Sequence, residues 1–327
     1  MNHWKIGAVL ALLVGLGLTL GSIWYVGAQG LLQSVEQVGL GGFAFYVIYN
    51  LMVFLPLGWA WWTTAPGAPR GQLLLFPWGR LVREAAADVL PFSQVGGLFV
   101  GVRAVQQGGV CEPMAVASQI ADLTTEMASQ LLYTLFGVAM LMAILSHNTD
   151  TGRLLWTALS ALALGAVTLT AFVALQSRGL DVAGALAARW LEDMRERAGA
   201  VKISLRSIYA QPQRLLGGVL LHSAAWVLSG AGSWFALNFM GFHLPLWKVL
   251  TLESLMSAVR SVAFMTPGGL GFQEGAYVLT APLFGLPPAA ALSVALLRRA
   301  KDLLIGIPAM IVWQYGEVTA RRRAPAA

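Results

Sequence analysis

The chain has 327 residues, of which 57% are apolar and 11% are charged, with a net charge of +6. Because a soluble domain carries about 25% charged residues, this composition excludes a soluble globular protein. We expect an all-α, polytopic bundle of membrane helices that forms a single transmembrane domain over residues 1–327. The single Cys111 excludes a disulfide framework and a thiolate metal cluster.

A helix needs about 20 apolar residues to span a bilayer, and several apolar runs of the sequence approach this length. In chain order they are 6–28, 40–62, 131–145 with an upstream extension, 154–176, 215–242 and 303–315. The first run resembles a signal peptide, with Lys5 before it. Its apolar core is longer than the about 7–15 residues of a signal peptide. We therefore expect a first span that is retained.

The positive side chains indicate the topology, because Lys and Arg concentrate in cytoplasmic loops. The connection 177–214 holds seven of them, and the chain ends near three arginines at 321–323. With the N-terminus inside, fourteen loop cations are cytoplasmic and two are external. Arg80 and Arg83 are counted among the fourteen. We therefore expect a multi-pass protein of the bacterial cytoplasmic (inner) membrane with both termini in the cytoplasm.

A segment of the chain recurs, because residues 91–126 resemble residues 267–302 at an offset of 176. The matched pairs are Pro91 and Pro267, Gly109 and Gly285, Asp122 and Arg298, and Glu126 and Asp302. We expect two repeats, one over about 6–145 and one over about 154–316, each with a Pro/Gly-broken re-entrant element. Such duplicated, broken elements form the substrate sites of many transporters.

The distribution of loop charge predicts that the first re-entrant element enters the membrane from the cytoplasmic side and the second from the outside. The two halves are then inverted repeats, related by an axis in the membrane plane. The alternative is that each element crosses the membrane fully and the halves are parallel. The Gly, Gln and Pro content of 91–110 and 266–285 favours inversion, because such segments are poor lipid-facing spans.

Polar side chains follow one face of the helix predicted after the first element. They are Ser118, Asp122, Thr125, Glu126, Ser129, Gln130 and Tyr133. A charge at the bilayer centre costs about 2.5–3.5 kcal/mol on insertion scales, so this face avoids lipid. The second repeat carries Arg298, Lys301 and Asp302 at matching places. We expect Asp122 and Glu126 to pair with Arg298 and Lys301 beside a substrate cavity, or alternatively in a purely structural latch.

The candidate substrate-binding residues lie in and beside the two re-entrant elements. Glycines let backbones approach closely, and broken helices expose amides and carbonyls that bind a polar head group. Glu274 and Arg103 are the ionisable side chains nearest those breaks. The complete set is Gln94, Gly96, Gly97, Arg103, Asp122, Glu126, Arg260, Gly268, Gly269, Gly271, Glu274, Arg298, Lys301 and Asp302.

The connection 177–214 has apolar residues at helical spacing and charged residues on its other face. This pattern predicts an amphipathic helix on the anionic inner leaflet. The alternative is a helix that packs on cytoplasmic loops. Neither interpretation indicates catalysis.

The segment PGGLGFQEG at 267–275 resembles the P-G-G-x-G-x-x-E signature of flippase-like membrane domains in lysylphosphatidylglycerol synthases. Residues 81–97, 122–126 and 297–302 look like the hopanoid-biosynthesis-associated branch of that superfamily. The resemblance implies an integral membrane protein that moves or handles lipids, hopanoids or lipids made alongside them. No soluble aminoacyl-transferase domain follows in the sequence, so aminoacylation of lipid is not implied.

These observations favour a lipid translocator or lipid-binding transporter that is not an enzyme. The sequence contains no G-x-x-x-x-G-K-[ST] loop of the kind that binds ATP. Proton coupling through Asp122, Glu126 or Glu274 stays open. The alternative is an intramembrane enzyme or a scaffold acting on lipid head groups. The four histidines, among them His222, show no metal-ligand spacing, and we expect no cofactor. The expected partners are membrane lipids and lipid-biosynthesis enzymes, without nucleic acid. The sequence determines neither the lipid nor the oligomeric state.

Overall fold

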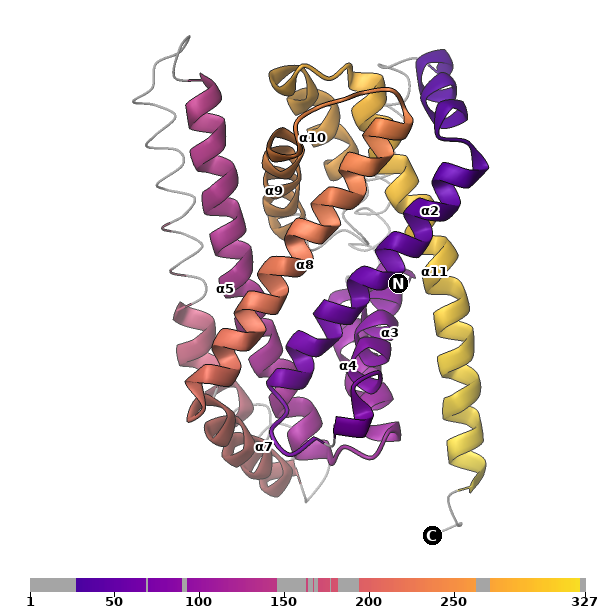
Figure 1. Ribbon diagram of the computed structural model, residues 1–327. Helices are drawn as coiled ribbons and strands as arrows, with labels where there is room; N and C mark the ends of the chain where they lie inside the picture. The colour runs from indigo at the N-terminus through magenta and orange to yellow at the C-terminus, as the bar shows by residue number, and fades with distance from the viewer. Residues whose placement is uncertain are drawn as a thin grey trace, which may run out of the picture. The chain divides into compact units, whose positions relative to one another are not determined.

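The computed structural model describes residues 28–68, 70–89, 93–145, 163, 167, 170–176, 178–181, 194–262 and 271–323. In this part of the chain every regular element is a helix (Figure 1), so the expected all-α class is confirmed. The α-helices are α2 (Ala28–Thr63), α3 (Leu75–Val89), α4 (Ser93–Gln107), α5 (Glu112–Leu145), α7 (Met194–Tyr209), α8 (Pro212–Phe239), α9 (Leu246–Val262), α10 (Phe272–Thr280) and α11 (Pro288–Arg323). Two short 3-10 helices are η1 (Arg70–Gln72) and η3 (Ala281–Phe284).

Three of these helices have stretches long and apolar enough to cross a membrane. They are Glu36–Thr63 in α2, Glu112–Ile144 in α5 and Pro212–Phe239 in α8. The predicted spans at 40–62, 131–145 and 215–242 lie largely or wholly in these stretches, and 303–315 lies in α11. The run 6–28 lies outside the described residues except for Ala28, and the run 154–176 is described only at 163, 167 and 170–176. Pro91 and Pro267 also lie outside the described residues.

The order of elements recurs at the spacing seen in the sequence. The apolar stretches of α2 and α8 begin at Glu36 and Pro212, 176 residues apart, and both have 28 residues. Helices α5 and α11 begin at Glu112 and Pro288, again 176 residues apart. A glycine with φ near 95° or 77° precedes each of them, a conformation that glycine adopts at low cost. The inverted relation of the repeats stays a prediction.

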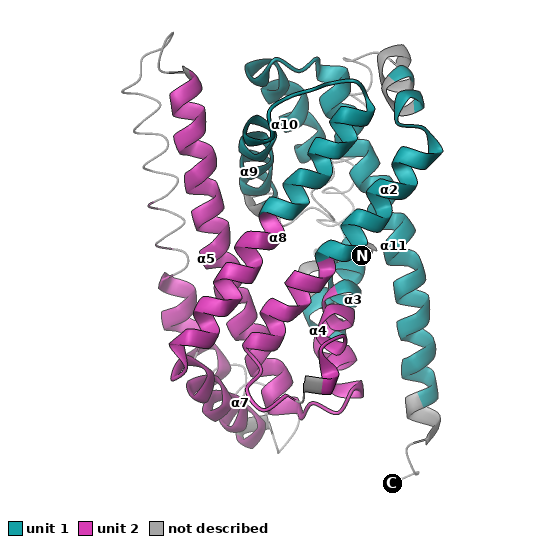
Figure 2. Ribbon diagram, in the orientation of Figure 1, with its two compact units in different colours: residues 1–53, 81–100, 227–327 teal, residues 54–80, 101–226 magenta. Residues whose placement is uncertain are grey.

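The chain forms two compact units (Figure 2). Unit 1 contains residues 1–53, 81–100 and 227–327, and unit 2 contains residues 54–80 and 101–226. Helices α2 and α8 are each divided between the two units, α2 after Val53 and α8 after Trp226. The units therefore do not coincide with the predicted repeats, because each unit combines segments of both.

In unit 2 the C-terminal half of α2 packs closely on the start of α3. A Cβ added at Gly58 would lie 2.1 Å from the backbone nitrogen of Pro77, so only glycine fits there. Trp61 and Phe76 meet edge to face, with ring centroids 5.7 Å apart, and are fully buried. Val105 of α4 joins this core. The close contact fixes α3, and with it the charged residues on its next turn.

Helix α7 of the predicted amphipathic connection packs on the first half of α5. Val201, Leu205 and Ile208 of α7 form a buried cluster with Ala117 and Ala121 of α5. Protein therefore covers the apolar face that the sequence assigned to the inner leaflet. The prediction of a leaflet-bound face is wrong for α7, because the small alanines of α5 offer a surface that the apolar stripe buries.

Unit 1 is held together by aromatic rings between the N-terminal half of α2 and the C-terminal half of α8. Phe45 lies 5.2 Å from Phe235 and 5.6 Å from Phe239 between ring centroids, both edge to face. The hydroxyl of Tyr49 donates a 3.0 Å hydrogen bond to the Leu228 carbonyl. Helix α10 packs on α9 and α11 in the same unit, which positions the charged residues of those helices.

Candidate functional site

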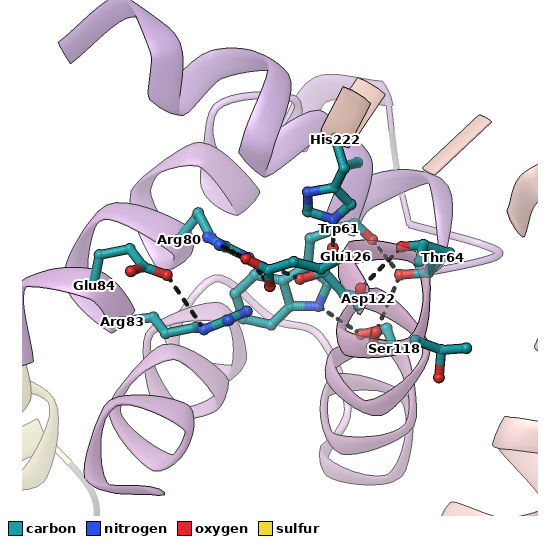
Figure 3. Close-up of polar contacts among 12 residues, drawn as sticks. Trp61, Thr64, Arg80, Arg83, Glu84, Ser118, Asp122, Glu126 and His222 are labelled. Atoms are coloured by element: carbon teal, nitrogen blue, oxygen red, sulfur yellow. Dashed lines mark hydrogen bonds and ion pairs between the residues drawn. The ribbon is translucent and has the colours of Figure 1, made fainter. Parts of the chain in front are cut away.

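Unit 2 holds a buried group of charged side chains that we call the α5 cluster: Arg80, Asp122, Glu126 and His222 (Figure 3). Arg80 comes from α3, the two acids lie one turn apart on α5, and His222 comes from α8. Nη1 of Arg80 donates to Asp122 Oδ2 at 3.2 Å and to Glu126 Oε2 at 2.9 Å. Nε2 of His222 lies 2.9 Å from Asp122 Oδ1.

The α5 cluster is almost completely removed from solvent. Asp122 and His222 are 0% exposed and Arg80 is 3% exposed. Burying an ion costs several kcal/mol, which is offset when good geometry and further hydrogen bonds satisfy the charge. Arg80 contacts both oxygens of Glu126, and such bidentate pairs are among the strongest. Removing one partner would therefore leave an uncompensated charge inside the protein.

Neutral hydrogen bonds hold the helix that carries the acids. The indole nitrogen of Trp61 donates to the Ser118 hydroxyl at 3.0 Å, and the Thr64 hydroxyl donates to the Ser118 carbonyl at 3.0 Å. One turn beyond Glu126, the hydroxyl of Ser129 accepts from the indole of Trp226 at 3.2 Å. These bonds tie α5 to α2 and α8 on either side of the acids and so fix the direction of both carboxylates.

Unit 1 holds a second buried group, the α11 cluster: Ser233, Glu253, Tyr277 and Arg298. The guanidinium of Arg298 on α11 donates to the Glu253 carboxylate of α9 and, at 3.0 Å, to the Ser233 hydroxyl of α8. The Tyr277 hydroxyl of α10 donates to the other oxygen of Glu253. Glu253 is 5% exposed, so its charge depends on these two donors.

Further ion pairs lie beside the α11 cluster. Arg299 Nε donates to Glu274 Oε1 at 3.1 Å, and the other oxygen of Glu274 accepts from the Gly271 amide at 2.7 Å. Glu274 therefore caps the start of α10, where Gly271 has φ 79°. Lys301 and Asp302 pair at 2.6 Å. Both of these lie within electrostatic range of Asp88 on α3, as does Arg260 at the end of α9.

The two clusters have the same design with the signs exchanged. In unit 2 the helix before the element supplies the cation, Arg80, and the long helix supplies the acid, Asp122. In unit 1 the preceding helix supplies the acid, Glu253, and the long helix supplies the cation, Arg298. In both units an ion pair thus joins the preceding helix to the long helix, with opposite polarity.

Each predicted repeat also contributes a side chain to the cluster of the other repeat. His222 lies in the second repeat and contacts Asp122 of the first. Tyr46, 176 residues before His222, lies in the first repeat and within electrostatic range of Arg298 and Glu253 of the second. Both clusters are therefore completed by the long apolar helix of the opposite repeat.

Within each unit, the charged residues of the predicted ion pairs have partners that the sequence analysis did not name. Arg80 and His222 lie beside Asp122, Glu253 lies beside Arg298, and Lys301 pairs with Asp302. The expected pairing of Asp122 and Glu126 with Arg298 and Lys301 would join unit 2 to unit 1 and stays a prediction. Within each unit, a helix that precedes the predicted element provides a counter-charge: α3 for the acids of α5, and α9 for Arg298 of α11.

The remaining predicted site residues differ in their surroundings: some are packed, some are exposed and some lie outside the described residues. Gly97 packs α4 on α3, because a Cβ there would lie 2.6 Å from the Arg83 carbonyl oxygen. Gly96 has open space around its Cα, and Arg103 is exposed on α4. Gln94 lies in the first turn of α4, with a side chain outside the described part. Gly268 and Gly269 also lie outside the described residues.

Sequence reasoning missed Arg80 and His222 as members of a buried site. Arg80 was counted as a loop cation, but it and Arg83 are 3% and 6% exposed within α3. Without Arg80 and Arg83, the loops assigned to the cytoplasm still hold more cations than the external loops. The signal for His222 was its 176-residue offset from Tyr46. Among the described residues, no group of three or more His, Cys, Asp or Glu is placed to hold a metal ion.

Fold and site together define a multi-pass α-helical membrane protein with a repeated order of elements and a buried ion-pair cluster in each compact unit. The chain belongs to the family described as the lysylphosphatidylglycerol synthase TM region, whose model matches residues 9–309. This family links the protein to lipid metabolism. Neither the comparison with curated proteins nor that with solved structures finds a match.

Proposed function

We propose that this protein is a lipid translocator or lipid-binding transporter of the bacterial inner membrane, with both termini in the cytoplasm. The observation that carries the proposal is the pair of buried clusters, one in each unit. Ionisable side chains within membrane helices are costly and mark substrate paths in many membrane proteins. Membership of a lipid-metabolism family makes a lipid the substrate class.

The clusters suggest how a polar head group is accommodated. Neutral side chains also contact the ion pair of the α11 cluster. The Ser233 hydroxyl accepts a hydrogen bond from Arg298, and the Tyr277 hydroxyl donates one to Glu253. A zwitterionic or anionic head group exchanges its own charge for one partner of such a pair, while the acyl or polycyclic part stays in lipid. The desolvation of the head group is then offset by charge-assisted hydrogen bonds.

The lipid class proposed first is the hopanoids or a polar lipid made alongside them. The support is the resemblance of residues 81–97, 122–126 and 297–302 to the hopanoid-associated branch. Lipid-biosynthesis enzymes are the proposed protein partners. The alternative function, an enzyme or scaffold acting on head groups, is favoured by one observation, the buried contact between His222 and Asp122, because such pairs also serve acid/base chemistry.

Reconstitution tests the proposal. Purified protein is placed in phosphatidylcholine vesicles with a trace of NBD-labelled phosphatidylglycerol or phosphatidylethanolamine, and dithionite reports the label in the outer leaflet. We expect label to become accessible from the inner leaflet faster than in protein-free vesicles, without chemical change by mass spectrometry. A modified head group would support the enzyme. A folded protein that neither moves nor modifies either lipid, nor a hopanoid supplied in the same vesicles, would refute transport.

A matched pair of variants connects the activity to the clusters. Arg298→Gln removes the cation from the α11 cluster, whereas Arg197→Gln removes a cation whose side chain is 52% exposed and pairs with Glu112. We expect at least a tenfold loss of lipid movement for the first and less than a twofold change for the second. Equal effects would show that buried charge at this place has no special role.

A further inference from the structure

His222 and Asp122 form a buried contact between two membrane-spanning helices of unit 2. His222 lies on α8 and Asp122 on α5, within stretches long and apolar enough to cross a membrane. Their atoms Nε2 and Oδ1 are 2.9 Å apart, and both side chains are 0% exposed. Burying a polar side chain costs free energy unless it is hydrogen-bonded, so the contact with Asp122 offsets the burial of the imidazole.

The second ring nitrogen of His222, Nδ1, makes no hydrogen bond to the described part of the chain. This nitrogen is also buried. Gln119, one turn before Asp122 on α5, is 3% exposed, and neither its amide nitrogen nor its amide oxygen has a partner there. Unsatisfied buried polar atoms cost about 1–3 kcal/mol each. Nδ1 of His222 is therefore a buried ring nitrogen that can take up a proton.

His222 lies among the charged side chains of the α5 cluster. Two acids of α5, Asp122 and Glu126, and one cation of α3, Arg80, form the cluster with it. The next cation along α3, Arg83, lies 3.7 Å from Glu84. Histidine is the side chain that changes charge near neutral pH.

We propose that His222 and Asp122 are a proton-binding site that couples lipid movement to the proton gradient. This inference rests on the proposed transport function and adds its energy source. One proton binds to Nδ1 of neutral His222 and gives Asp122 a second cationic neighbour beside Arg80. The attachment of α8 to α5 strengthens when the proton binds and weakens when it leaves, so the proton biases one arrangement of these helices. Intramembrane acids and histidines form proton relays in other transporters.

The test uses the full-length protein in phosphatidylcholine vesicles that contain a trace of NBD-labelled phosphatidylglycerol and trapped pyranine. Valinomycin and potassium hold the membrane potential at zero, and a gradient of one pH unit is applied. If one proton moves with one lipid, the gradient drives the leaflet ratio of the label toward about tenfold, since one pH unit corresponds to a factor of ten. Pyranine should report proton movement that requires the protein.

Two histidine variants provide the matched comparison. His222→Gln keeps a nitrogen that donates to Asp122 but cannot take up a proton. His243→Gln removes an exposed imidazole that contacts Asn238 outside the cluster. We expect the leaflet ratio under the gradient to fall to about one for H222Q, whatever its basal rate. The ratio and the basal rate should both be unchanged for H243Q.

The outcomes separate the two proposals. If the wild type moves lipid without a gradient but shows neither proton movement nor a leaflet ratio that follows the gradient, the proton site is wrong and transport stands. If the wild type moves no lipid, the transport proposal itself fails. H222Q and H243Q with equal ratios would also overturn the proton site. If H222Q does not fold, the proton movement of the wild type still decides whether lipid movement is coupled to protons.

Discussion

Removal of one partner from the α11 cluster gives the sharpest test of the ion-pair geometry. In Arg298→Met the Glu253 carboxylate, with 5% of its side chain exposed, loses its guanidinium. Breaking a buried pair costs about 3–5 kcal/mol. We expect the lower end, about 3 kcal/mol, because Tyr277 continues to donate a hydrogen bond to Glu253. That loss corresponds to about a hundredfold change in the folding equilibrium.

The double variant Glu253→Leu with Arg298→Met distinguishes a structural latch from a functional pair. Replacing a buried ion pair by apolar residues of similar volume is often neutral or stabilising. The hydroxyls of Ser233 and Tyr277 lose their partners, at about 1 kcal/mol each. We therefore expect the double variant to be no less stable than either single variant, and to remain inactive in lipid movement.

Unfolding in mixed micelles by increasing SDS, followed by tryptophan fluorescence and circular dichroism, measures these free energies. Arg197→Met serves as the control, because its pair with Glu112 is about half exposed and such pairs contribute about 0–1 kcal/mol. The reasoning is refuted if R298M loses less than about 1 kcal/mol, or if the two single losses add in the double variant. A stable double variant with full activity would show that the pair is only a latch.

Two further changes test the packing that positions the clusters. Gly58→Ala brings a Cβ to 2.1 Å from the Pro77 backbone nitrogen, so we expect a loss of at least about 3 kcal/mol, measured by the same SDS unfolding. Gly71→Ala, with open space at its Cα, should cost under about 1 kcal/mol, and equal losses would contradict the close contact. Leu205→Ala removes a buried side chain of α7 that packs on α5, and we expect thermal melting to show a loss of about 2–5 kcal/mol. Ile203→Ala, 70% exposed on the same helix, is the control, and a similar melting temperature for both would place the apolar face of α7 elsewhere.

The local features of the fold could be predicted from the sequence because they depend on neighbouring residues. Apolar runs of sufficient length predicted the stretches Glu36–Thr63 and Pro212–Phe239. Gly109 recurs at Gly285, and both glycines have positive φ just before α5 and α11. Length, hydropathy and backbone freedom are properties of a segment, so no tertiary contact was needed to find them.

The candidate site could be predicted only in part. Helical periodicity placed Asp122 and Glu126 on one face and indicated that this face avoids lipid, which agrees with their burial or partial burial. Periodicity says which side of a helix is polar, but it does not say which helix lies opposite. The 176-residue match suggested a partner in the other repeat, whereas the cation that meets both acids is Arg80 of α3.

The sequence by itself determined that this is a helical membrane protein with a repeated order of elements and acids where lipid should be. Only the tertiary structure decided that α3 and α9 carry the counter-charges and that His222 contacts Asp122. It also decided that α5 covers the apolar face of α7. The physical reason is the same in each case. Charge and hydrophobicity state that a partner is needed, and only the packing of distant segments selects which one supplies it.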